Sequence, residues 1–187
     1  MTEKFEKIIT KVAKEMVHEL SEEELDYYFF CTNNKWIDLK IRTEVIKSLP
    51  KDDKLVHKIA IWDSDYRNRL AAIERIDDEK VLERIVCSDS NAMCQRSAIK
   101  KITDSKRLLK IIIYPNLPYI VKKLGVENIN GQREIEQVAM RNSEDWRIRV
   151  LAIKKMLNKE LLEKLQFCDD CYDIIKEEAE ARLKQLV

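Results

Sequence analysis

Two cysteines near the C-terminus have a spacing that metal sites and redox sites both use. Cys168 and Cys171 are separated by two aspartates. Structural zinc takes four ligands, but the chain has no second Cys-x-x-Cys, and His18 and His57 are its only histidines. A redox pair is expected at the start of a helix in a thioredoxin-like context, which is absent here. The sequence therefore favours structural cysteines, without a metal or a cofactor.

Aromatic side chains could stack on nucleic-acid bases. The candidates are Trp36, Trp62, Trp146, Tyr66 and Tyr119. Tyr66, Tyr119 and Trp146 occupy one position of a repeated pattern described below, which is typical of packing residues. None of the 34 acidic residues stands out as a lone catalytic acid. We therefore expect a protein that is not an enzyme.

The same pattern places basic residues at two positions that are four residues apart. These positions hold Asp53 with His57, Lys80 with Arg84, Lys106 with Lys110, Arg133 with Gln137, and Glu160 with Lys164. Residues four apart share one face of a helix. The sequence predicts a polar, centrally basic binding surface whose candidate residues are His57, Lys80, Arg84, Lys106, Lys110, Arg133 and Lys164. The alternative is a solvated face whose charges only aid solubility.

The elements that carry these residues come from an internal repeat. Its reference position holds a small residue at steps of 27, 26, 27, 27 and 27: Val45, Ala72, Ala98, Gly125, Ala152 and Ala179. The positions one, four and ten residues later are apolar in nearly every copy. Such regularity over five periods predicts a repeat architecture.

Each copy reads as two short helices. Apolar residues at spacings of three and four surround the reference position. Turn and N-cap residues follow, namely Pro50, Asp77-Asp78, Thr103-Asp104-Ser105, Asn130-Gly131 and Asn158. Only 2 glycines and 3 prolines in 187 residues also favour helices over hairpins. One helix pair cannot bury its apolar face alone, so we expect copies to stack into an α-solenoid.

These positions resemble HEAT repeats, in particular their short bacterial variants. An acid stands seven residues before the reference position as Asp38, Asp65 and Asp145, with Asn91 in one copy. A hydrophobic–basic pair follows it as Ile41-Arg42, Val121-Lys122, Ile148-Arg149 and Ile175-Lys176. The resemblance covers about residues 36–187. The period is shorter than the ~40–47 residues of ordinary HEAT units, which suggests shortened second helices and also resembles leucine-rich repeat variants.

The resemblance implies an interaction scaffold more than an activity. In such solenoids the second helix lines the concave face, so the basic positions would form one strip there. We expect a protein partner with an acidic surface. The alternative is a nucleic-acid-binding solenoid of the DNA-repair type, including the DNA glycosylases built on this fold.

Two acid–base pairs of the pattern suggest structural ion pairs. Asp65 and Arg69 lie four residues apart, as do Asp145 and Arg149, and such residues can pair on a helix. We expect them to stack near the junctions between copies and to satisfy buried helix ends.

The fold expected is all-α, with about five repeats in one continuous domain. We expect residues 1–34 to form an N-terminal helical cap, because Phe5, Ile8 and Val12 begin an apolar stripe at helical spacing, and residues 35–187 to form the repeat array. The alternative for this stripe is a helix that binds a membrane or a partner.

The composition argues against a membrane or secreted protein. The five cysteines are odd in number and scattered, unlike a disulfide framework. We see no signal peptide and no apolar run near the ~20 residues of a membrane span. These features predict a cytoplasmic protein that does not bind membranes.

Overall fold

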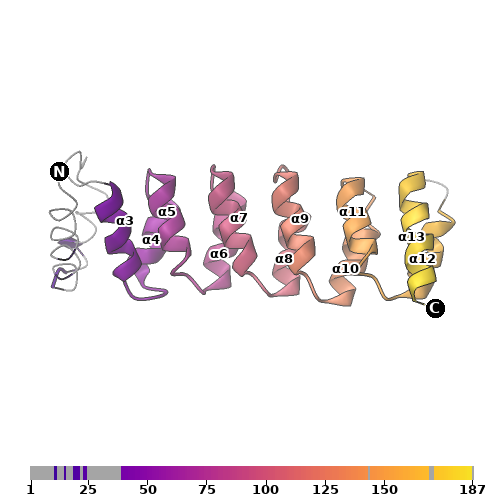
Figure 1. Cartoon of the computed structure of the whole chain (residues 1–187), viewed down its shortest axis with the longest axis horizontal. Coiled ribbons are helices and arrows are strands. Elements are labelled where there is room, and N and C mark those ends of the chain that lie inside the picture. Colours follow the sequence, from indigo (N-terminus) through magenta and orange to yellow (C-terminus); the bar gives the residue numbers. More distant parts are fainter. Residues whose placement is uncertain are drawn as a thin grey trace. The chain divides into compact units, whose positions relative to one another are not determined.

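The computed structural model describes residues 11, 15, 19–21, 23–24, 39–142, 144–168 and 171–186. In this part of the chain every regular element is an α-helix and none is a strand (Figure 1). The expected all-α class is therefore confirmed. The cap proposed for residues 1–34 lies almost wholly outside the described residues and stays a prediction.

The chain divides into two compact units, residues 1–98 and 99–187, with the boundary inside α7. The described helices of the first unit are α3 (Leu39–Ser48), α4 (Lys54–Trp62), α5 (Tyr66–Ile73), α6 (Glu79–Ser88) and most of α7 (Ala92–Lys101). Those of the second unit are α8 (Ser105–Ile112), α9 (Tyr119–Asn128), α10 (Gln132–Ala139), α11 (Trp146–Ile153), α12 (Lys159–Gln166) and α13 (Asp173–Gln185).

Helices pack with the same alternation in both units. In the first unit α3 contacts α5, and α4 contacts both α5 and α6. In the second unit the consecutive pairs α8–α9, α10–α11 and α12–α13 pack together (Figure 1). There α9 also contacts α11, α11 contacts α13, and α8 contacts α10. Helices of the same kind in the sequence repeat therefore lie side by side within a unit.

The apolar positions of the repeat form the core. All six reference residues are buried, Gly125 included. The residues ten positions later are also buried: Leu55, Leu82, Leu108, Ile135 and Leu162. The predicted burial of these positions is therefore confirmed, and burial of this kind is the main favourable contribution to folding.

Four of the five expected turns supply the N-cap of a second helix, namely Asp78, Asp104, Gly131 and Asn158. Asp78 accepts a hydrogen bond of 2.7 Å from the Lys80 amide, and Asn158 accepts one from the Leu161 amide. Asp104 accepts from the Arg107 amide, which lowers the pKa of its carboxyl. These bonds satisfy amide groups that the first turn of a helix leaves unpaired.

A further position, three after the reference residue, joins neighbouring copies of the repeat. There a side chain donates to carbonyls at or near the C-terminal end of the preceding copy's first helix. Arg75 Nε lies 3.1 Å from the Leu49 carbonyl, Asn128 Nδ2 3.2 Å from that of Ile99, Lys155 Nζ 2.8 Å from that of Glu127, and Arg182 Nε 2.9 Å from that of Met156. Burial lowers the pKa of Lys155. We call these four donors the carbonyl clasps.

Gly125 is a closely packed reference position. A Cβ atom added there would lie 2.9 Å from Ile112 Cγ1 and 3.2 Å from Ile99 Cδ1. Both neighbours are fully buried, so they have little room to move.

Gly125→Ala is therefore expected to destabilise the protein. Overpacking a core costs about 1–3 kcal/mol, and the better helix propensity of alanine returns at most about 1 kcal/mol. Urea denaturation followed by circular dichroism should show a lower midpoint with an unchanged slope. A midpoint above that of the wild type would show that α9 does not approach its neighbours this closely.

Candidate functional site

All seven candidate binding residues lie on second helices and outside the core. The exposed ones are Lys80 and Arg84 on α6, Lys106 and Lys110 on α8, Arg133 on α10 and Lys164 on α12, and His57 on α4 is partly exposed. They fall into two sets, three residues in the first unit and four in the second. Their place on one concave strip and their role in binding stay predictions.

His57 is engaged in a contact between loops. Its Nε2 lies 3.3 Å from Asp52 Oδ1, which also accepts from the amides of Asp77 and Asp78 at 2.7 and 3.0 Å. Burial alone would raise the pKa of Asp52, but these hydrogen bonds outweigh it and lower that pKa. His57 therefore helps to hold the turn before α4 to the turn before α6.

Arg84 lies against an exposed tryptophan. Its guanidinium carbon is 5.4 Å from the ring centroid of Trp62, close enough for a cation–π interaction. Trp62, the last residue of α4, is 65% exposed, and Lys80 precedes Arg84 by one turn of α6. From the sequence, Trp62 was only a candidate for base stacking. Its contact with Arg84 could not be found there, because it depends on how α4 packs against α6.

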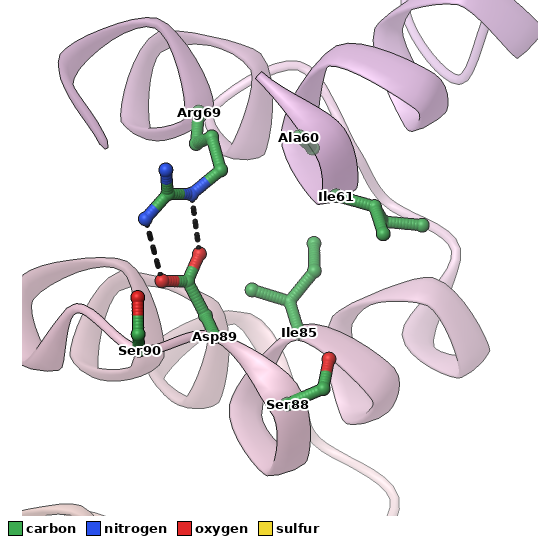
Figure 2. A pocket seen from close by; sticks show the side chains of 7 residues that line it. All are labelled: Ala60, Ile61, Arg69, Ile85, Ser88, Asp89 and Ser90. Atoms are coloured by element: carbon green, nitrogen blue, oxygen red, sulfur yellow. Dashed lines mark hydrogen bonds and ion pairs between the residues drawn. The ribbon is translucent and has the colours of Figure 1, made fainter. Parts of the chain in front are cut away.

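A pocket of about 170 Å³ opens beside this pair of helices (Figure 2). Its lining residues are Ala60, Ile61, Arg69, Ile85, Ser88, Asp89 and Ser90. Arg69 and Asp89 face each other there through two hydrogen bonds of 2.8 Å. The pocket wall thus carries an ion pair whose charges neutralise each other.

The expected pairing of Asp65 with Arg69 is wrong. Asp65 is the N-cap of α5 and binds Arg67, with Nη2 2.8 Å from Oδ2. This bond lowers the pKa of Asp65. The N-cap stands outside the helix, so the spacing rule for residues inside it does not apply. Arg69 binds Asp89 and donates to the Asp63 carbonyl at 2.8 Å, as expected for a residue that satisfies a buried helix end.

The same correction holds in the second unit. Asp145 is the N-cap of α11 and binds Arg147 at 2.6 Å, which lowers the pKa of Asp145. Arg149 instead points inward and is 3% exposed.

The second unit offers three basic side chains that form no ion pair within the described residues. Lys106 and Lys110 lie on α8, and Arg133 lies on α10, which packs against α8. Lys164 differs, because its Nζ is 2.7 Å from Glu160 Oε1 and lowers the pKa of Glu160. The positive charge of Lys164 is therefore largely offset, and the candidate surface of this unit reduces to α8 and α10.

The aromatic column expected to pack is partly exposed. Tyr66, Tyr119 and Trp146 are 37, 37 and 41% exposed. Each is the first residue of its helix. Arg147 lies 4.5 Å above the ring of Tyr119.

The cysteines also depart from expectation. Cys168 and Cys171 form a disulfide, with Cα atoms 5.5 Å apart, whereas the sequence favoured unlinked structural thiols. Cys87 and Cys94 are free, and burial raises the pKa of Cys94 to about 11. Among the described residues, no three side chains that could ligate a metal come together.

Comparison with protein-family models, curated proteins and solved structures finds no match to this chain. Over the part of the chain that is described, no helix has the length and apolar character needed to cross a membrane.

Proposed function

We propose that the protein is a non-enzymatic, HEAT-like repeat scaffold of the cytoplasm that binds an acidic protein surface through its second helices. The 27-residue pattern supports the repeat assignment, since its apolar positions are buried while the basic positions of the second helices are exposed. The alternation of helix contacts within each unit is what stacked α-solenoid copies would give.

The observation that carries the proposal is the contact of Arg84 with Trp62. Tryptophan and arginine are the residue types that most often dominate the energy of protein interfaces. Here both are exposed, they hold each other in place, and Lys80 adds a second positive charge on the same helix. An acidic partner could insert a carboxylate beside the guanidinium while covering the indole ring.

The second unit would add a separate basic patch. Lys106, Lys110 and Arg133 form no ion pair within the described residues, although Asp104 lies close enough to Lys106 to offset part of its charge. Like charges held together on neighbouring helices attract anionic groups and speed their association, mostly at low salt.

Charge reversal tests both patches. Arg84→Glu and Lys110→Glu are each expected to weaken binding of a fluorescein-labelled poly-glutamate peptide about tenfold, or ~1.4 kcal/mol, as measured by fluorescence anisotropy at low salt. The melting temperature should change little, because both side chains are exposed and the contact of Arg84 with Trp62 is worth only about 0.5–1 kcal/mol at an exposed site. Arg96→Glu is the matched control and should bind like the wild type. Arg96 is exposed on α7, which is the first helix of its repeat copy and lies outside the proposed surface.

A short duplex DNA is the competing probe. Tighter binding to DNA than to the peptide, with a log–log salt slope near −0.9 for each neutralised phosphate, would favour the nucleic-acid alternative. Equal losses in all three variants would mean that only net charge matters, and the proposed surface would be wrong.

A further inference from the structure

The disulfide of Cys168 and Cys171 closes the connection between α12 and α13. The two residues are three positions apart and bracket two residues outside the described part of the chain. Cys168 is partly exposed, whereas Cys171 is only 8% exposed. Cys168 is thus the more accessible residue of the pair.

A buried cation faces the sulfur of Cys171. Arg149 is 3% exposed, its Nε donates to the Ala139 carbonyl at 2.8 Å, and its Nη2 lies 3.7 Å from Cys171 Sγ. Burial lowers the pKa of Arg149, which means that the buried charge is costly without an anion beside it. Among the described residues, the side chain contacts no carboxylate.

Other copies of the repeat place a carboxylate opposite the equivalent basic residue. The pairs are Arg42 with Asp63 at 2.7 Å, Arg69 with Asp89 at 2.8 Å, and Lys122 with Glu144 at 2.7 Å. Glu144 follows Lys122 by 22 residues, and Cys171 follows Arg149 by the same number. A sulfur therefore occupies the place of the counter-ion. This sulfur can carry a negative charge only as a thiolate, after the disulfide has been reduced.

We propose that Cys168 and Cys171 form a reversible thiol–disulfide exchange site for small thiols such as glutathione, in which Arg149 stabilises the thiolate of Cys171. The cation favours the reduced state, because a disulfide sulfur has no charge to offer it.

The exchange balances as follows in atoms and electrons. A glutathione thiolate attacks Sγ of Cys168, the S–S bond breaks, and Cys171 leaves as a thiolate with the electron pair. A second glutathione thiolate attacks the glutathione sulfur of the mixed disulfide and releases Cys168. Two glutathiones become one glutathione disulfide, and the protein gains two electrons. One of the two thiol protons ends on Cys168, and the other goes to solvent.

The test is a redox titration of the full chain in glutathione buffers, followed by acid quenching, alkylation and peptide mass spectrometry. Cys168 and Cys171 are expected to change together from disulfide to dithiol. Cys94 should stay reduced throughout, because it is buried and its thiol pKa is high. A pair that remains oxidised in reduced glutathione alone, or never joins in glutathione disulfide, would overturn the proposal.

Arg149 is examined with Arg149→Met and the charge-preserving Arg149→Lys. Loss of the cation in Arg149→Met should favour the disulfide about tenfold, which makes the reduction potential of the pair ~30 mV more negative. Arg149→Lys should restore part of this change. An unchanged potential in folded Arg149→Met would remove Arg149 from the site.

A second measurement covers the case in which Arg149→Met does not fold. In Cys168→Ala, a pH titration followed by thiolate absorbance near 240 nm should show that the Cys171 thiol ionises at a pH well below the pKa of an ordinary cysteine. Ionisation of Cys171 at or above the pKa of an ordinary cysteine would contradict the proposal.

Discussion

Aspartate in place of Ala152 is expected to lower the free energy of unfolding by about 3–5 kcal/mol, the range found when a buried charge has no partner. Ala152 has no exposed surface, and it occupies the reference position of α11, which packs against α9, α10 and α13. A loss of this size is a large part of the ~5–15 kcal/mol that stabilises a typical domain. Urea denaturation at pH 7 would measure it.

The loss should shrink in acid. Burial raises the pKa of the introduced carboxyl in the folded state above its unfolded value. The folded state therefore binds the proton more tightly, and stability falls as pH rises through that interval. Ala181→Asp is the control, because Ala181 is exposed on α13 and loses only the ~0.7 kcal/mol or less of helix propensity. Equal losses in both variants would contradict the predicted register.

Arg69→Met is the second change with a large expected effect, again about 3–5 kcal/mol. Methionine fills much of the space but leaves the Asp89 carboxylate, 4% exposed in its side chain, without its two bonds. The Asp63 carbonyl also loses a donor. Thermal and urea denaturation should both report the loss.

Two further variants isolate the ion pair. Arg67→Met removes an exposed pair on the same helix and should leave stability nearly unchanged, because exposed ion pairs contribute little. Asp89→Asn in the Arg69→Met background removes the stranded charge and should recover part of the stability. No recovery would mean that Arg69 acts through packing alone.

The core could be predicted from the sequence because buried residues recur with the period of the internal repeat. Ile73, Ile99 and Ile153 recur one residue after the reference position, and all three are fully buried. The burial of a position that is apolar in every copy can be predicted without knowing which residues it contacts. The N-caps could be predicted because they are also local. Asp78 and Asn158 accept hydrogen bonds from amides two and three residues further along the chain.

The partners of charged residues could not be predicted in this way. Arg69 reaches Asp89 across 20 residues, and Trp62 meets Arg84 only because α4 packs against α6. Such contacts depend on the angle and rotation between helices, which a repeat period does not contain. The Cys168–Cys171 pair was missed for a related reason: its spacing is shared by metal sites, redox pairs and unlinked thiols.

The carbonyl clasps have a consequence for how a unit comes apart. Lys155 of one copy satisfies carbonyls of the preceding first helix, and Arg182 does the same for the copy that contains Lys155. If the outermost helix pair frays, the carbonyls of the preceding first helix lose the side-chain donors that satisfy them, which adds to the cost of opening that pair. Because each clasp ties one helix pair to the next, the second unit should show amide hydrogen exchange as one cooperative block rather than as a gradient. The same donors restrict which insertions and deletions the fold tolerates. A segment of one whole period can be gained or lost with every clasp intact, whereas a shorter segment cannot.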